Sequence, residues 1–212
     1  MLTLLAWTLV LLALLALAAP LLARAGLGVR LVFAGSMAAC LVFTGAAVLG
    51  LLSPAAALTL PIGPPWGPAR LALDALSAWF LLILGLAGIA ASAFAFGHAK
   101  GAEAPRRLVP YPLFLAGMAL TLLAADGFTL ILGFELMSFA SWVLVAHDHH
   151  QEENQRAARV YLGFAALGGL ALMLCFGLLA WGASAGAGFE ALRAAPPEGL
   201  RAGAILALVL IG

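Results

Sequence analysis

The sequence predicts an all-α protein, a polytopic bundle of transmembrane helices. Of its 212 residues, 65% are hydrophobic and 9% are charged, whereas soluble domains carry about 25% charged residues. The apolar residues also gather in runs of about 20, the length that a helix needs to cross a bilayer. Six runs of this length and a shorter seventh predict six full helices followed by a truncated one.

The long runs cover residues 2–22, 31–52, 75–96, 108–125, 128–146 and 160–181. The first run is also compatible with a signal peptide, but no Lys or Arg precedes it, so we expect a retained helix. The seventh run, 202–212, has 11 residues and reaches about 16 Å, half of a hydrocarbon core of about 30 Å. We therefore expect the chain to be a fragment of a longer protein, or to be completed by another subunit.

The connections between the runs carry turn and cap signals. Segment 53–74 is rich in Pro and Gly and is too broken for a helix, and LTLPIG, 58–63, suits a short extended piece. Asp74 and Ser77 have the spacing of an N-cap at the start of the third helix. Asp126 and Gly127 are interpreted as a tight turn, which makes the fourth and fifth helices antiparallel neighbours.

Charge predicts the orientation. Loops one, three and five carry seven Lys and Arg residues and the other loops carry three, so the odd loops are expected in the cytoplasm and the N-terminus outside the cell (inner) membrane. The seven are Arg24, Arg30, Lys100, Arg106, Arg107, Arg156 and Arg159, and the three are Arg70, Arg193 and Arg201. The fifth helix then runs from outside to inside.

Glu135 is the main candidate functional residue, because it lies near the middle of the fifth apolar run. A carboxylate at the bilayer centre costs about 2.5–3.5 kcal/mol on insertion scales, and such residues usually face a protein interior or a hydrated path. Ser138 and Ser141 follow it and are placed near the same helical face, where hydroxyls would line a proton path with Glu135. The alternative is a structural hydrogen bond between helices.

Three histidines follow the fifth helix, His147, His149 and His150, in the polar segment 147–159. Their placement fits a solvated loop at a helix end, a cytoplasmic access point for protons, or, least well, a metal site beside Asp148. We predict no metal.

Other kinds of chemistry find no support in the sequence. Cys40 and Cys175 each lie inside an apolar run without a CxxC or metal-ligand spacing, so they are interpreted as packing residues. No nucleotide loop, nucleophile triad, haem motif or iron–sulfur spacing is present, which predicts no cofactor and no covalent chemistry in this chain. The net charge of +1 gives no reason to expect nucleic acid as a partner.

Three stretches resemble one known family. GFELMSFASWVLVAH, 133–147, resembles the F/W-E-L-M-S-L-A-S-Y motif of the antiporter-like membrane subunits of respiratory complex I, multi-subunit cation/proton antiporters and membrane-bound hydrogenases. Residues 71–92 resemble their "D-x-L-S-x-F-F" third helix. Residues 157–180 are most similar to the sixth helix of the antiporter-like membrane component of hydrogenase-4 and of its formate hydrogenlyase counterpart, although the His of that pattern is Ala166 here.

The resemblance implies a 14-helix subunit with two inverted five-helix repeats. Residues 1–107 would then hold three leading helices, and 108–212 an incomplete first repeat. In the family the Glu of the fifth helix pairs with a Lys on a broken seventh helix. Of that pair, only Glu135 maps onto this chain, and Lys100 lies in a loop.

The function implied is that of a proton-translocating membrane subunit of a respiratory or hydrogenase-type complex related to NADH-quinone oxidoreductase. Such a subunit is itself non-catalytic and couples redox chemistry in partner subunits to ion transport. Its expected partners are the lipid bilayer, other membrane subunits of the complex, and protons or monovalent cations. The alternatives are a subunit of a multi-subunit cation/proton antiporter, or a structural or non-functional truncated fragment.

Overall fold

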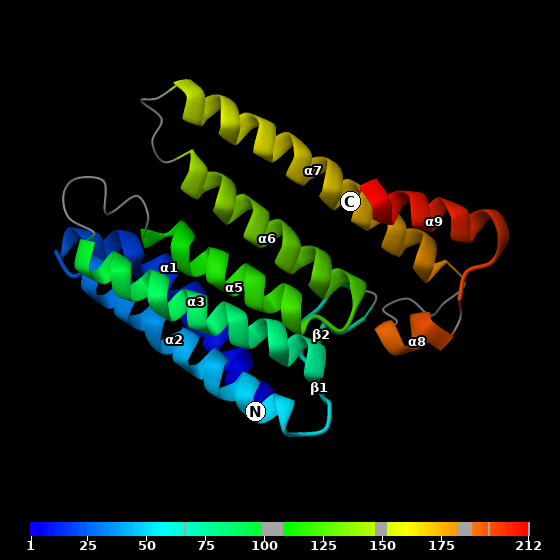
Figure 1. Cartoon of the computed structure of the whole chain (residues 1–212), viewed down its shortest axis with the longest axis horizontal. Coiled ribbons are helices and arrows are strands. Elements are labelled where there is room, and N and C mark those ends of the chain that lie inside the picture. The colour runs from blue at the N-terminus through cyan, green and yellow to red at the C-terminus, as the bar shows by residue number, and fades with distance from the viewer. Residues whose placement is uncertain (66, 99–107, 147–151, 182–187, 195, 212) are drawn as a thin grey trace.

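The computed structural model describes residues 1–65, 67–98, 108–146, 152–181, 188–194 and 196–211. Its helices lie side by side as a bundle, with a small hairpin at one end (Figure 1). The elements in chain order are α1 (Leu2–Arg24), α2 (Gly28–Leu51), β1 (Ala56–Thr59), β2 (Arg70–Leu73), α3 (Ala75–His98), α5 (Pro110–Leu123), α6 (Gly127–Val145), α7 (Glu152–Ala180), α8 (Phe189–Ala194) and α9 (Gly199–Ile211).

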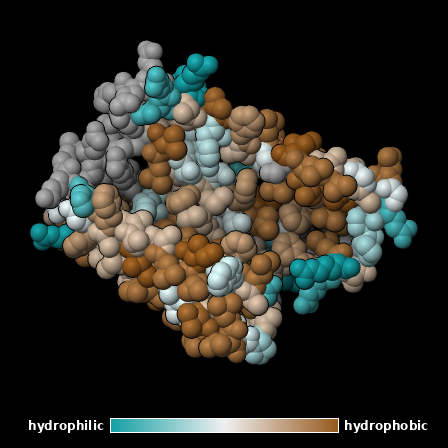
Figure 2. All heavy atoms as spheres, in the orientation of Figure 1, coloured by the Kyte–Doolittle hydropathy of each residue, from teal (hydrophilic) through white to brown (hydrophobic). Residues whose placement is uncertain are grey.

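Five of the described helices are long and apolar enough to cross a membrane: α1, α2, α3, α6 and α7. The fourth expected span corresponds to α5, whose 14 residues reach about 21 Å, less than a hydrocarbon core. Pro110 stands at its start, and the chain turns to extended backbone at Ala124, which ends the helix early. Hydrophobic residues cover much of the visible surface and hydrophilic ones gather towards its ends (Figure 2), as expected for a bundle in a bilayer.

The hairpin of β1 and β2 departs from a purely helical fold. The strands are antiparallel, with Ala56 opposite Leu73 and Thr59 opposite Arg70. An extended piece was expected at 58–63, and β1 overlaps it only at Leu58 and Thr59. Leu71 and Leu73 are fully buried and join the main core with Leu5, Phe43 and other residues of α1, α2, α3 and α5. The hairpin therefore closes one end of the bundle, which we call the hairpin end.

Close helix contacts build this core. A Cβ at Gly85 would overlap Thr44, and a Cβ at Gly88 would overlap the Cys40 sulfur, so α3 can approach α2 only because these positions lack side chains. The predicted N-cap of α3 is also confirmed, since Asp74 Oδ1 accepts a hydrogen bond of 2.7 Å from the Ser77 backbone N–H. That bond lowers the pKa of Asp74.

The later helices are added in sequence order to the outside of this core. α6 packs against α5, α7 against α6, and α9 against α7 (Figure 1). The polar segment 147–159 was expected to be a loop, and this is wrong for its second half, because α7 already begins at Glu152. Residues 152–159, EENQRAAR, are mostly strong helix formers with acids in the first turn, which favours a helical start.

Candidate functional site

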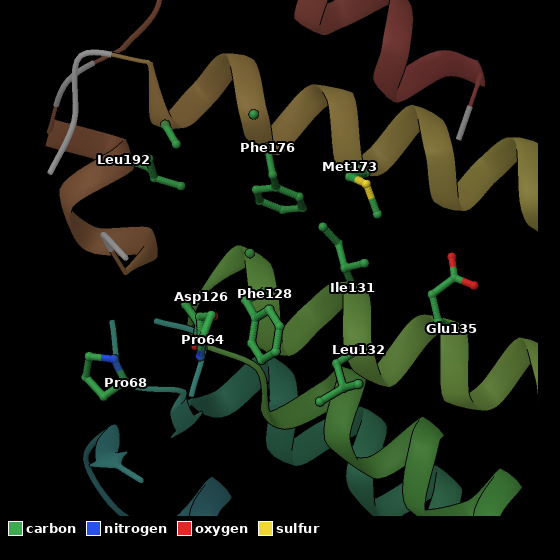
Figure 3. Close-up of a pocket in the computed structure, with 13 residues that line it drawn as sticks. Pro64, Pro68, Asp126, Phe128, Ile131, Leu132, Glu135, Met173, Phe176 and Leu192 are labelled. Carbon is green, nitrogen blue, oxygen red and sulfur yellow. The ribbon is translucent and has the colours of Figure 1, made fainter. Parts of the chain in front are cut away.

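Glu135 lies midway along α6 and points towards α7 (Figure 3). Its carboxylate reaches the α7 backbone at Gly169, where an added Cβ would overlap Oε1 and would lie 3.1 Å from Cδ. Within this chain the side chain is nevertheless exposed. An exposed carboxylate on a membrane-spanning helix is unfavourable against lipid, so the open side of Glu135 requires a proton, a cation or a polar partner.

A hollow of about 520 Å³ opens beside Glu135 between α6 and α7. It extends from the carboxylate to the hairpin end of the bundle, where Pro64 and Pro68 line it (Figure 3). Its walls are largely apolar, with Ile131 and Leu132 from α6 and Met173 and Phe176 from α7 among the lining residues. The ionisable side chains among the described lining residues are Asp126 and Glu135, which places one carboxylate towards each end of the hollow.

The two helices touch at both ends of the hollow. At the hairpin end, a Cβ on Gly127 would lie 2.7 Å from a ring carbon of Phe176, so α7 rests directly on the start of α6. Phe176 also stacks on Phe189 of α8, with ring centroids 5.8 Å apart. At the far end the contact is that between Glu135 and Gly169. The hollow thus lies between two contacts of α6 with α7.

Asp126 fixes the start of α6. Its carboxylate accepts three hydrogen bonds: from the Thr129 backbone N–H at 2.8 Å, from Thr129 Oγ1 at 2.6 Å and from the Arg70 backbone N–H at 2.7 Å. Asp126 is 4% exposed, so these bonds are sheltered from water. The prediction of a simple turn residue was therefore incomplete, because Asp126 is an N-cap that also holds the hairpin.

The chain between α5 and α6 pairs with segments on both sides. Ala125 donates its N–H to Arg70 O at 3.0 Å and accepts from the Phe189 N–H at 3.0 Å. Isolated β-bridges join Leu71 to Ala124 and Asp126 to Gly188. This junction ties the hairpin, the α5–α6 turn and the start of α8 together, so α6 is anchored at the hairpin end.

Arg201 performs a matching role at the end of α7. Its guanidinium donates to Leu178 O from Nε at 2.9 Å and to Leu179 O from an η nitrogen at 3.1 Å. Carbonyls in the last turn of a helix lack partners within the helix, and a cation there also suits the helix dipole. From the sequence, Arg201 was interpreted only as a loop charge.

Ser138 and Ser141, the other predicted site residues that the structure describes, do not line the hollow. Ser138 is 4% exposed and Ser141 is half-buried, and neither contributes to the walls around Glu135. His147, His149 and His150 lie outside the described residues. Among the residues that are described, no group of three or more His, Cys, Asp or Glu side chains is arranged to hold a metal ion.

Gly169 is the site residue that the sequence did not point to. No motif in the sequence singles out position 169, yet it faces the carboxylate of Glu135. A signal for Asp126 was present, because an Asp directly before an apolar run is a typical N-cap.

Known proteins resemble the chain in sequence and in fold, although no protein-family model matches it. An uncharacterized protein of Mycobacterium tuberculosis (strain H37Rv) is 28% identical over 166 residues, which are 78% of this chain and 26% of that protein. NADH-quinone oxidoreductase subunit N 1 of Rhizobium meliloti (strain 1021) is 33% identical over 138 residues, 62% of this chain and 28% of that subunit. The chain spans about a quarter of the length of these curated relatives.

Solved structures share the fold. A chain of the membrane-bound sulfane sulfur reductase, an archaeal respiratory membrane complex, matches 98% of this chain with a TM-score of 0.85 at 17% identity, over 43% of its own length. A chain of the Mrp complex from Dietzia sp. DQ12-45-1b matches 98% with a TM-score of 0.77 at 20% identity, over 23% of its length. The chain is a multi-pass membrane protein with this fold. Helices that leave large apolar side chains exposed fit a place in lipid and beside other membrane subunits.

Proposed function

We propose that the chain acts in a proton-translocating, antiporter-like membrane subunit of a respiratory or hydrogenase-type complex. Redox chemistry would take place in partner subunits, and this chain would supply part of the ion path. The fold shared with a respiratory membrane complex and the likeness to an NADH-quinone oxidoreductase subunit support the class of complex. The similarity of residues 157–180 to the antiporter-like components of hydrogenase-4 and formate hydrogenlyase supports the finer assignment.

The observation that carries this proposal is the exposed carboxylate of Glu135 midway along a membrane-spanning helix. In an apolar surrounding, such a group is stable when it is protonated or when a cation lies beside it. A change in its partner therefore releases or takes up a proton. This is the coupling that a redox-driven transporter needs, with Glu135 as the group that changes charge.

The rest of the proposed architecture follows from the resemblance. Residues 1–107 form the leading helices and 108–212 part of a first inverted repeat of a 14-helix subunit, and a Lys outside this chain pairs with Glu135. The hairpin end lies on the non-cytoplasmic side of the inner membrane, a side that the distribution of Lys and Arg favours. Protons enter from the cytoplasmic end through His147, His149 and His150, and Ser138 and Ser141 assist near Glu135.

The experiment is proton transport by the complete complex in vesicles carrying Glu135→Gln. Gln keeps the size and hydrogen bonding of Glu but carries no charge, so we expect transport to fall by roughly 100-fold or more at normal assembly. Glu190→Gln, the same change on exposed α8, is the matched control and should transport normally. Unchanged pumping by an assembled Glu135→Gln complex would reject the role.

A cation/proton antiporter subunit without a redox partner is the second candidate, favoured by the fold shared with the Mrp complex. Co-purification separates the two: hydrogenase or quinone-reducing subunits favour the first, and other small membrane subunits the second. A structural role is the third candidate. It predicts that Glu135→Ala changes assembly or nothing, and leaves transport by any assembled complex intact.

A further inference from the structure

The contact between Glu135 and Gly169 differs from the surroundings of Gly163 and Gly177, two other glycines of α7. A Cβ built at Gly169 would overlap Oε1 of Glu135 and would lie 3.1 Å from Cδ and 3.7 Å from Oε2. The same construction at Gly163 and Gly177 meets no atom within 4 Å. Gly169 is buried, whereas Gly163 is exposed. The missing side chain at position 169 thus matters for one neighbour, the carboxylate.

The neighbour at Gly169 is also of a different kind from those in the tight helix contacts. At Gly117 and Gly133 an added Cβ would meet backbone nitrogens of the facing helix, which move only if the helices separate. At Gly169 it would meet the end of a side chain that can rotate away. A methyl group there would displace the carboxylate while leaving the helices in place.

We infer that Gly169 is a positioning residue for Glu135, because its lack of a side chain leaves room for the carboxylate against the α7 backbone. The carboxylate can then lie between α6 and α7 at one end of the hollow, and a larger side chain at position 169 would force it into another rotamer (Figure 3). This fixes the position from which Glu135 exchanges its proton or meets a cation. The inference rests on the proposed transport role of Glu135.

The first test compares Gly169→Ala with Gly163→Ala in the complete complex. Both add one methyl group to α7, and only the first meets Glu135. We expect both to assemble and melt like the wild type, while Gly169→Ala lowers proton transport by roughly 10- to 100-fold, because a misplacement of about 1 Å can cost that much. Equal transport by the two variants would overturn the inference.

The second test is a double-mutant cycle with Glu135→Asp. Asp is one methylene shorter, so its carboxylate no longer reaches the added methyl group. We expect Gly169→Ala to cause no further loss of transport in the Glu135→Asp background, although it does so in the wild type. Losses that simply multiply would show that the two positions act independently and would contradict the inference.

Assembly and the result with Glu135→Gln complete the design. If Gly169→Ala prevents assembly, restored assembly in the Glu135→Asp background supports the contact, and continued failure overturns it. If Glu135→Gln pumps normally, the proposed function fails. If Glu135→Gln abolishes pumping and Gly169→Ala matches Gly163→Ala, the positioning role fails alone.

Discussion

The two sides of α6 differ in how they meet their neighbours. Towards α5, glycines face backbone: a Cβ on Gly117 would lie 2.5 Å from Met137 N, and a Cβ on Gly133 would lie 2.7 Å from Thr121 N. Towards α7, the helices touch at Gly127 and Gly169 and leave a hollow of about 520 Å³ between these contacts. The closed side fixes α6 to the bundle, and the open side carries the ionisable group.

This difference fits the demands of a transport site. On the α5 side the helix backbones are packed so closely that a carboxylate there would have no room beside it for a proton carrier or a cation. On the α7 side, Glu135 contacts Gly169, is exposed within this chain and adjoins the hollow. A rigid helix that presents its acid on the loosely packed side combines a fixed position with access.

The largest expected effect comes from the junction that anchors α6 at the hairpin end. Asp126→Ala removes the N-cap of α6 and leaves the buried donors of Arg70 and Thr129 without their acceptor. We expect a destabilisation of roughly 2–4 kcal/mol, seen as a lower thermal midpoint of the purified complex.

Asp126→Asn is the control, because its amide oxygen still accepts a hydrogen bond, and it should lose about half as much. An Asp126→Ala complex as stable as the wild type would show that the junction does not anchor α6.

A smaller effect is expected when a methyl group is added to either of the two helices that flank α6, at Gly117 of α5 or at Gly177 of α7. Gly117→Ala forces a Cβ against Met137 backbone, so we expect a loss of roughly 1–3 kcal/mol. Gly177→Ala borders the hollow and meets nothing within 4 Å, so the better helix propensity of Ala should leave stability unchanged or raise it by up to about 1 kcal/mol. Thermal unfolding of both variants measures these changes in stability. Equal changes would contradict the claim that α6 packs more tightly against α5 than against α7.

The sequence was sufficient for five of the expected spans and for Glu135 within one of them. Long apolar runs, the Pro- and Gly-rich break before Asp74 and the position of Glu135 are local patterns, and the structure places long helices, a non-helical segment and a mid-helix carboxylate there. The early end of α5 depends on partners elsewhere in the chain. α5 stops at Leu123 because residues 124–126 pair with Arg70, Leu71 and Gly188.

The site was harder to predict because its second half lies on another helix. Nothing in the local pattern around Gly169 distinguishes it from Gly163, and only the packing of α7 against α6 brings one of them to Glu135. Asp126 was interpreted as a turn residue, and its bond to Arg70 joins residues 56 positions apart.

The most direct measurement of the central claim is infrared difference spectroscopy of the complete complex during turnover, in the wild type and in Glu135→Gln. If Glu135 takes up and releases the transported proton, a carbonyl band of a protonated carboxyl group appears and disappears with turnover in the wild type and is absent from the variant. Identical difference spectra from the two proteins would contradict the claim.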